Sequence, residues 1–138
     1  MPDSHELLLF GFGSSTMIST VPMNMFSHDN PVCNNVVTGI WTSSAEREQS
    51  KFGTSHSVFD DVARQGPLIS TLPPTHEWDV RDDADFVHYC DNETATGFEF
   101  NDFPYEVFEE QYIVSDLSSN IGSKFIDWTK LDVGYACA

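Results

Sequence analysis

Short apolar runs alternate with polar stretches along most of this chain of 138 residues. An apolar run bounded by Gly, Pro, Asn, Asp or Ser is typical of a buried β-strand. The first run, HELLLFGF, fits this description, and DFVHYCDNE alternates before it ends in polar residues. The predicted strands cover residues 5–12, 34–41, 56–61, 85–93, 111–120 and 133–138, and ATGFEF at 95–100 is a further short strand or hairpin arm.

Two polar stretches have the composition of helices. The first covers residues 17–26, with the Ser/Thr cluster at 14–16 as its N-cap and Pro22 bending or ending it. The second, TSSAEREQSKFG at 42–53, is amphipathic and stops at its glycine. Residues 65–80 are a proline-punctuated connection without repeats. Because strands and helices alternate in the first half, the sequence predicts an α/β fold with a mostly parallel sheet and flanking helices.

Polar residues follow several of the predicted strands. Residues 13–15, 92–94 and 116–119 each come at the end of an apolar run. Ligands of open α/β sheets bind at the carboxyl ends of the strands. We therefore expect the three polar clusters to converge on one site.

The charge of the chain limits its partners. Acidic residues outnumber basic residues by 22 to 6, which gives a formal net charge of -16. Nucleic-acid backbones and anionic membranes need clustered Lys and Arg, so the charge argues against both as partners. An anionic small substrate would need basic groups from elsewhere. A soluble, self-repelling surface is the simpler interpretation of the same charge.

The cysteines and the N-terminal residues indicate in which cellular compartment we expect the protein. Cys33, Cys90 and Cys137 are widely spaced and form no C-x-x-C pair, so the sequence predicts neither a zinc site nor a disulfide framework. His88 and Cys90 share one face of a predicted strand, where a core position is favoured over metal ligation. The start, MPDSHELLLFGFG, has no basic segment, and its apolar run is too short for a signal peptide or membrane span. We expect a cytoplasmic, reduced protein without a metal ion.

Gly13, Ser14 and Ser15 stand between a predicted strand and a predicted helix. The free backbone N–H groups and the helix dipole at such a turn favour an anion. One interpretation is a phosphate cradle, and the other is an ordinary strand-to-helix turn. The motif is neither a P-loop nor G-x-G-x-x-G, so it does not decide between them.

Three further residues carry candidate chemistry. Asp116 follows the apolar run YIVS, where burial without a partner is costly, so it either accepts from a protonated pyridine nitrogen or caps the local turn with Ser118. Trp41 ends a predicted strand and either stacks on a flat cofactor or belongs to the core. Together with the hydroxyl of Thr94 and an anion cradle, these groups match the partners that pyridoxal phosphate uses in an aminotransferase-type large domain.

Longer stretches resemble one enzyme family. VVTGIWTSSAEREQSKFGT, FVHYCDNETATGFEF and SDLSSNIGSKFIDWTKLDVGYACA are strongly similar to phosphoserine aminotransferases, which are fold-type I enzymes that use pyridoxal 5'-phosphate. The run H-Y-C-x-N-E-T is close to a family signature, and PMNMF also fits. The likeness covers essentially the whole chain in order and is weaker between Phe59 and Thr75. It implies an incomplete large domain of an enzyme that converts 3-phosphohydroxypyruvate and glutamate to phosphoserine and 2-oxoglutarate in serine biosynthesis.

Carried over position by position, the resemblance implies roles for five residues. Ser14 and Ser15 match the positions whose backbone amides hold the cofactor phosphate. Trp41 matches the tryptophan that stacks on the pyridine ring, and Thr94 matches the threonine that contacts the ring hydroxyl. Asp116 matches the aspartate bonded to the pyridinium nitrogen, a bond that keeps the ring protonated so that it acts as an electron sink.

The sequence departs from the family pattern at three positions. Phe12 stands where a glycine is usual, Ser115 replaces a usual alanine, and Cys137 replaces a usual glycine. Together these changes point to a divergent member or a relaxed sequence.

The resemblance also implies that residues 1–138 are an internal segment of the large domain. The N-terminal segment with substrate-binding basic residues, the Schiff-base lysine and the small domain have no counterpart in the sequence. Lys124 and Lys130 cannot replace that lysine, because both precede the last predicted strand. We therefore expect no catalytic residue and no transaminase activity in the chain alone. The rival hypothesis is a non-catalytic fragment or pseudoenzyme that binds the cofactor weakly or pairs with a full-length subunit, since the family enzymes are homodimers with small-molecule substrates.

Overall fold

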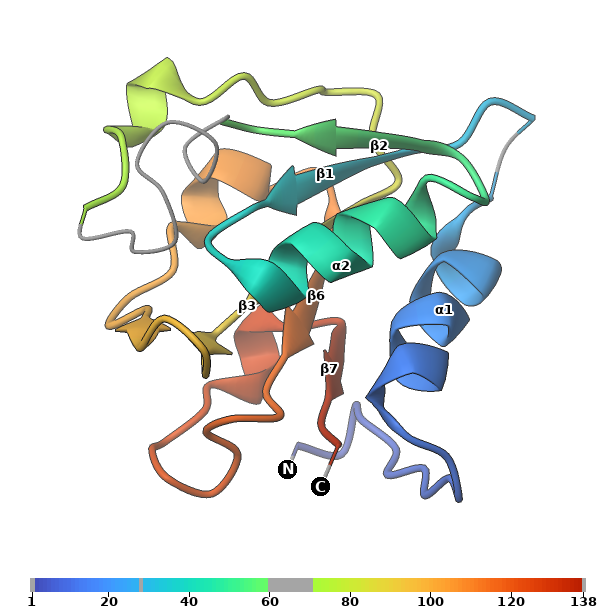
Figure 1. The fold of residues 1–138 in the computed structure, drawn as a ribbon, viewed down its shortest axis with the longest axis vertical. Helices are drawn as coiled ribbons and strands as arrows, with labels where there is room; N and C mark the ends of the chain where they lie inside the picture. Colours follow the sequence, from blue (N-terminus) through green and yellow to red (C-terminus); the bar gives the residue numbers. More distant parts are fainter. Residues whose placement is uncertain (1, 28, 60–70, 138) are drawn as a thin grey trace.

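The computed structural model describes residues 2–27, 29–59 and 71–137. Within them, five parallel strands form one sheet in the order β2-β1-β3-β6-β7, with α1 and α2 on one side of it (Figure 1). The predicted α/β fold with a mostly parallel sheet is therefore confirmed. The elements of these two layers are α1 (Ser14–Met25), β1 (Val32–Val36), α2 (Ile40–Gln49), β2 (Thr54–Ser57), β3 (Phe86–Cys90), β6 (Tyr112–Asp116) and β7 (Val133–Tyr135).

Shorter elements lie in the connections between the strands. The pair β4 and β5 forms an antiparallel hairpin after β3, so the predicted hairpin arm at 95–100 is confirmed. Residues 60–61 and 65–70, which belong to a predicted strand and a predicted connection, lie outside the described residues. The short elements are β4 (Asn92–Glu93), β5 (Phe98–Glu99) and the 3-10 helices η1 (Thr75–Glu77), η2 (Tyr105–Phe108) and η3 (Trp128–Lys130).

The central strands β1 and β3 are buried along their whole length, as expected for parallel strands covered on both faces. Such strands are usually continuous apolar runs, but β1 contains two buried asparagines. The side-chain amide of Asn34 donates to the Arg81 carbonyl and to Gln111 Oε1, each at 2.9 Å. Because these bonds satisfy the buried amide, a polar residue in β1 anchors two connections to the sheet.

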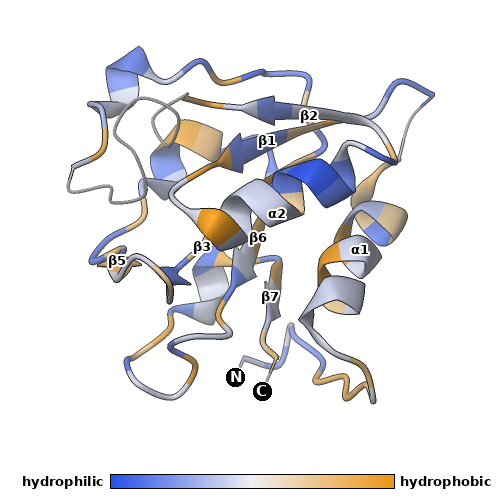
Figure 2. Cartoon of the chain, in the orientation of Figure 1, coloured by the Kyte–Doolittle hydropathy of each residue, from blue (hydrophilic) through white to orange (hydrophobic). Residues whose placement is uncertain are grey.

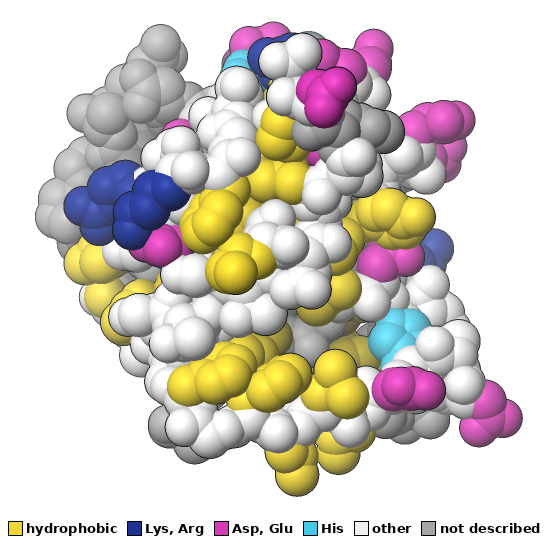
Figure 3. Space-filling view, turned by 90° about the vertical axis from the view of Figure 1, so that its right-hand side faces the viewer, with side chains coloured by type: hydrophobic (Ala, Val, Ile, Leu, Met, Phe, Trp, Pro, Cys, Tyr) yellow, Lys and Arg dark blue, Asp and Glu magenta, His cyan; other side chains and the backbone are white. Residues whose placement is uncertain are grey.

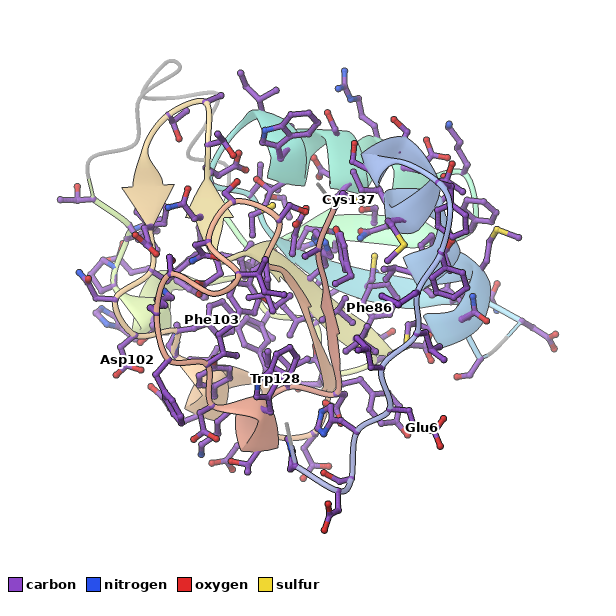
Figure 4. All side chains as sticks on the ribbon, turned by 90° about the horizontal axis from the view of Figure 1, so that it is seen from below. Glu6, Phe86, Asp102, Phe103, Trp128 and Cys137 are labelled. Carbon is purple, nitrogen blue, oxygen red and sulfur yellow. The ribbon has the colours of Figure 1, made fainter. Side chains whose placement is uncertain are left out.

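Side chains that alternate along the strands build two cores, one on each face of the sheet. On the helical face, Phe86 packs with Ile18 and Val21 of α1. On the other face, Phe103 packs against Tyr89, with ring centroids 3.7 Å apart. Figure 4 shows the separation, with Phe86 toward α1 and with Phe103 and Trp128 across the sheet.

Helix α2 packs through small and polar residues. Its hydropathy falls from a hydrophobic first residue to a hydrophilic C-terminal end (Figure 2). The buried positions are Thr42, Ala45 and Gln49, and their spacing of three and four residues places them on one face. No helix in the described parts of the chain combines the length and the apolar composition that a membrane crossing demands.

The predicted buried strand at residues 5–12 is wrong. This segment has no strand structure, and the side chains of Leu7 and Leu9 are 71% and 87% exposed. It contributes to a groove of about 630 Å³ that α1 and β7 also line. The face of the molecule on the α1 side carries several separate hydrophobic patches (Figure 3). An apolar run becomes a strand only where a neighbouring edge pairs with its backbone. Here the groove lies between the run and β7.

Helix α1 also differs from its prediction. It begins at Ser14, and its N-cap is Gly13, so the Ser/Thr cluster lies inside the helix and provides no side-chain cap. Pro22 does not end the helix, which continues to Met25. The proline ring is buried in the last turn, and its missing N–H group costs one helical hydrogen bond, the one to the Ile18 carbonyl.

We predict that the aromatic core beneath the sheet carries much of the stability. Phe103→Ala should lower the free energy of unfolding by about 3–5 kcal/mol, because it removes a ring that is only 3% exposed. Urea unfolding followed by far-UV circular dichroism measures the change. Phe125→Ala is the matched control, since that ring is 89% exposed and its loss should change the free energy by less than about 0.5 kcal/mol. Equal losses in both variants would contradict the assignment of Phe103 to the core.

Candidate functional site

The carboxyl ends of β1, β3, β6 and β7 meet at one edge of the sheet, because all four strands are parallel. Hydrogen bonds tie together the loops that leave this edge. The Asp91 N–H donates to the Asp116 carbonyl at 3.0 Å, and the Leu117 N–H donates to the Tyr135 carbonyl at 2.8 Å. The Cys137 N–H donates to Ser118 Oγ at 3.0 Å. The edge is therefore a single connected surface.

The carboxylate of Glu93 connects this surface to helix α2. It accepts from the backbone N–H groups of Trp41 and Thr42 at 3.1 and 2.8 Å, and from the Thr42 hydroxyl at 2.6 Å. These N–H groups have no partner inside the helix, and the helix dipole favours a negative charge beside them. Glu93 is completely buried, so it acts as an N-cap supplied by a distant part of the chain.

Gly39 makes this cap possible. A Cβ atom at Gly39 would lie 2.6 Å from the Glu93 Cδ atom, which is closer than real side chains approach. The Gly39 and Thr38 N–H groups in turn donate to Thr42 Oγ1 at 3.0 and 2.9 Å. The turn before α2 is therefore shaped around the Glu93 carboxylate.

The sequence predicted Trp41 at the end of a strand, and this prediction is wrong. Strand β1 ends at Val36, and Trp41 is the second residue of α2. The Glu93 cap explains why the prediction failed. It lets α2 begin at Ile40, within the segment 34–41 that the sequence assigned to a strand. The indole remains 41% exposed, so it is not a core residue.

Thr94 lies beside the loop that follows β6. Its hydroxyl is exposed and hydrogen-bonds the hydroxyl of Ser119. Because Glu93 precedes Thr94 and caps the helix whose second residue is Trp41, both predicted residues stand at the same edge as Asp116. The structure thus brings together three of the five predicted residues.

Asp116 ends β6 and is only 8% exposed. Its Oδ1 atom accepts from the Ser118 N–H at 2.9 Å, so the turn-capping role predicted as one alternative is present. The carboxylate also faces neighbouring groups that it influences. Burial, and after it the charge of Asp116, raises the pKa of the Tyr135 phenol and of the Cys90 thiol.

Ser14 and Ser15 lie in the first turn of α1. The first helical bonds run from the Thr16 and Met17 N–H groups to the Gly13 carbonyl, so the backbone N–H groups of Ser14 and Ser15 have no helical partner. Within the described parts of the chain, no side chain caps this helix. The N-terminus of α1 therefore fits an anion, although no hydrogen bond among the described residues links it to Trp41, Thr94 or Asp116.

His88 is buried beneath the site and was predicted only as a core residue. Its Nε2 atom lies 2.9 Å from the Tyr135 hydroxyl, and its Nδ1 atom has no hydrogen-bond partner among the described residues. Burial lowers the pKa of His88 from 6.5 to about 4, against the opposing charge of Asp116. Sequence reasoning missed Glu93 and Tyr135 as contributors to the site. Their position next to predicted site residues at strand ends was the available signal.

The lysines lie away from this group of residues or are engaged elsewhere. Lys51 follows the C-terminal end of α2, at the opposite end from Trp41. Lys130 lies in η3, before the amino end of β7. The Lys124 amine binds Asp91 at 2.6 Å and Glu99 at 3.3 Å, and these contacts outweigh burial and raise its pKa. A protonated, ion-paired amine is a poor nucleophile.

The chain is similar to phosphoserine aminotransferases over its whole length. It is 33% identical to the enzyme of Buchnera aphidicola subsp. Acyrthosiphon pisum (strain Tuc7) and 33% identical to that of Drosophila melanogaster, with all of this chain aligned in both cases. It spans only 37% and 36% of the length of these two relatives. No protein-family model matches the chain.

Solved structures support the same resemblance. The phosphoserine aminotransferase of Trichomonas vaginalis with bound PLP superimposes with a TM-score of 0.81 at 28% identity, covering 100% of this chain and 38% of that one. The enzyme of Bacillus circulans subsp. alkalophilus gives a TM-score of 0.79 at 31% identity, covering 91% and 33%. The resemblance predicted from the sequence motifs is therefore confirmed, for a chain just over a third as long as its curated relatives.

We predict that Glu93→Gln destabilises the fold. A glutamine amide has one acceptor oxygen and presents an N–H₂ group to the N–H groups of α2, so the free energy of unfolding should fall by about 1–3 kcal/mol. Urea unfolding measures the loss. Glu77→Gln is the matched control, because the Glu77 side chain is 59% exposed and should change stability by less than about 0.5 kcal/mol. If the two variants are equally stable, Glu93 does not act as a cap.

We also predict that stability falls with pH below about 6.5, where His88 is protonated in the unfolded chain and stays neutral when folded. The unfolded state then binds the extra proton, so the free energy of unfolding should fall by about 1 kcal/mol per pH unit between about pH 6.5 and 5. Urea unfolding at several pH values measures the slope. His88→Gln should flatten it, whereas His76→Gln, with a side chain 79% exposed, should leave it unchanged. An unaltered slope in His88→Gln would contradict this origin.

Proposed function

We propose that residues 1–138 form an internal segment of the cofactor-binding large domain of a phosphoserine aminotransferase. The reaction is the transfer of an amino group from glutamate to 3-phosphohydroxypyruvate, which yields phosphoserine for serine biosynthesis. The observation that carries the proposal is the meeting of Trp41, Thr94 and Asp116 at the carboxyl edge of a parallel sheet. The full-length similarity to enzymes of this name supports it.

Each of these residues has a chemical role toward pyridoxal 5'-phosphate. Asp116 would hold a proton at the pyridine nitrogen through a charge-assisted hydrogen bond, and its 8% exposure strengthens that bond by excluding water. The exposed indole of Trp41 would stack on the ring, and the Thr94 hydroxyl would bind the ring hydroxyl. When bound, the cofactor supplies an electron sink.

The phosphate of the cofactor would bind at the start of α1. The backbone N–H groups of Ser14 and Ser15 have no helical partner, and no side chain caps that end of the helix. An anion at this position satisfies the free donors and the helix dipole together. A cofactor bound in this way would contact the start of α1 with its phosphate and the edge of the sheet with its ring.

The lysine that attaches the cofactor and the basic groups that bind the substrate would come from outside the described residues. Lys51, Lys124 and Lys130 are not placed to attach the cofactor, for the reasons given above. The net charge of -16 also requires that basic groups for an anionic substrate come from elsewhere. We propose a cytoplasmic homodimer as the working form, because a second subunit is one source of such groups.

We predict that the chain binds pyridoxal 5'-phosphate without catalysing transamination. Asp116→Asn should weaken binding by roughly 10- to 150-fold, since a hydrogen bond to a charged group contributes about 1.5–3 kcal/mol. Equilibrium dialysis measures the Kd, and coupled assay of 2-oxoglutarate formation measures turnover. Asp102→Asn is the matched control, because Asp102 is exposed and lies across the sheet beside Phe103 (Figure 4). Its Kd should equal that of the parent chain.

Two results would contradict the proposal. The first is a Kd that is the same in Asp116→Asn, in Trp41→Ala and in the parent chain. The second is turnover together with a stoichiometric cofactor adduct on Lys51, Lys124 or Lys130, detected by borohydride reduction and mass spectrometry. Either outcome would show that Trp41 and Asp116 do not form the cofactor wall, or that the chain carries its own attachment lysine.

A further inference from the structure

Three buried polar side chains lie together on the helical face of the sheet, directly below the candidate site. They are His88 on β3, Asp116 on β6 and Tyr135 on β7, with exposures of 1%, 8% and 5%. Alternation along the strands places them on the face where Phe86, Val114 and Tyr135 pack against α1. The ring centroids of His88 and Tyr135 are 6.0 Å apart, and the planes are inclined by only 23°.

The hydrogen-bonding capacity of these groups decides where the protons lie. The Tyr135 hydroxyl has one proton to donate. His88 Nε2 lies 2.9 Å from it, and the register of β6 and β7 places Asp116 directly opposite Tyr135 on the same face of the sheet. A carboxylate is an acceptor only, so a phenol that donated to His88 would direct its lone pair at a negative charge. The Tyr135 proton is therefore better placed toward Asp116.

The imidazole of His88 supports the same direction. If Tyr135 donates to Asp116, then His88 must donate from Nε2 to the Tyr135 oxygen, and Nδ1 is the deprotonated nitrogen. Nδ1 is buried and has no hydrogen-bond partner in the part of the chain that the structure describes. A buried lone pair without a partner costs less than a buried N–H group without an acceptor. The carboxylate of Asp116 and the Nδ1 atom of His88 therefore favour the same proton arrangement, with His88 donating to Tyr135 and Tyr135 donating to Asp116.

We propose that His88 and Tyr135 are positioning residues for Asp116, in which His88 donates through Nε2–H to Tyr135 and Tyr135 donates to the Asp116 carboxylate. Together with the Ser118 N–H, which bonds Oδ1 at 2.9 Å, they hold the carboxylate in one orientation at the edge of the sheet. This inference rests on the proposed function only in that Asp116 is the partner of the cofactor nitrogen. The arrangement itself is a property of the chain without cofactor.

The first test measures the tautomer of His88 in the cofactor-free chain labelled with ¹⁵N. Long-range ¹H–¹⁵N spectra at neutral pH should show His88 as the Nε2–H form. Tyr135→Phe keeps the ring but removes the hydroxyl, and should abolish that preference. Tyr105→Phe is the matched control, because the Tyr105 hydroxyl bonds Tyr89 and its removal should leave His88 unchanged. An Nδ1–H form of His88 in the parent chain would overturn the proposal.

The second test follows the orientation of Asp116 by amide hydrogen exchange. The Ser118 N–H bonds the Asp116 side chain, whereas the Asp91 N–H bonds the Asp116 backbone carbonyl. In Tyr135→Phe, exchange at Ser118 should accelerate by roughly tenfold while exchange at Asp91 stays constant. Equal acceleration at both amides would indicate general loosening of the strands and would overturn a positioning role.

Cofactor binding separates this inference from the proposed function. Tyr135→Phe and His88→Leu should each weaken pyridoxal 5'-phosphate binding by several-fold, and His88→Gln, which keeps a donor near the Nε2 position, should restore most of the affinity. If the tautomer and exchange results are as expected but the parent chain does not bind cofactor, the proposed function fails and the His88–Tyr135–Asp116 arrangement stands. If binding depends on Asp116 but not on Tyr135, the positioning role is wrong and the proposed function stands.

Discussion

The burial of the Glu93 carboxylate against the first turn of α2 is the contact on which the candidate site depends. Glu93 is 51 residues away from Thr42 in the sequence, yet its carboxylate accepts both a backbone and a hydroxyl hydrogen bond from that residue. A buried carboxylate is stable only when donors surround it, and the free N–H groups of a helix start supply them. This one contact sets where α2 begins and therefore where Trp41 stands relative to Thr94.

The parallel sheet supplies the second constraint. Four strands end at the same edge. Backbone hydrogen bonds join the ends of β3, β6 and β7, and the Glu93 side chain joins the segment after β1 to them. Beneath that edge the helical face of the sheet is not purely apolar. His88, Asp116 and Tyr135 are buried there, and their mutual contacts offset the cost of removing polar groups from water. A polar layer therefore lies inside the core, directly beneath the site.

Two errors of sequence interpretation have the same physical origin. The run at residues 5–12 has the composition of a buried strand, but a strand also needs a neighbour, and the groove beside β7 leaves this run exposed. Trp41 follows an apolar run and was assigned to its end, but the Glu93 cap makes it a helical residue. Composition indicates which secondary structure a segment prefers. The structures of residues 5–12 and of Trp41 depended instead on partners far away in the chain. Strands β3 and β6 were predicted correctly, because each of them has a neighbouring strand on both sides to pair with its backbone.

The sequence by itself determined the α/β class, the alternation of strands and helices after residue 13, the acidic composition and the residues that resemble a cofactor wall. Each of these follows from local periodicity, composition or a short motif. Only the tertiary structure decided that the Glu93 cap makes Trp41 a helical residue, and that His88 meets Tyr135 across the intervening strand β6. The reason is that helix caps, strand neighbours and buried hydrogen bonds join residues distant in the chain, and no local pattern records which distant partner a residue will meet.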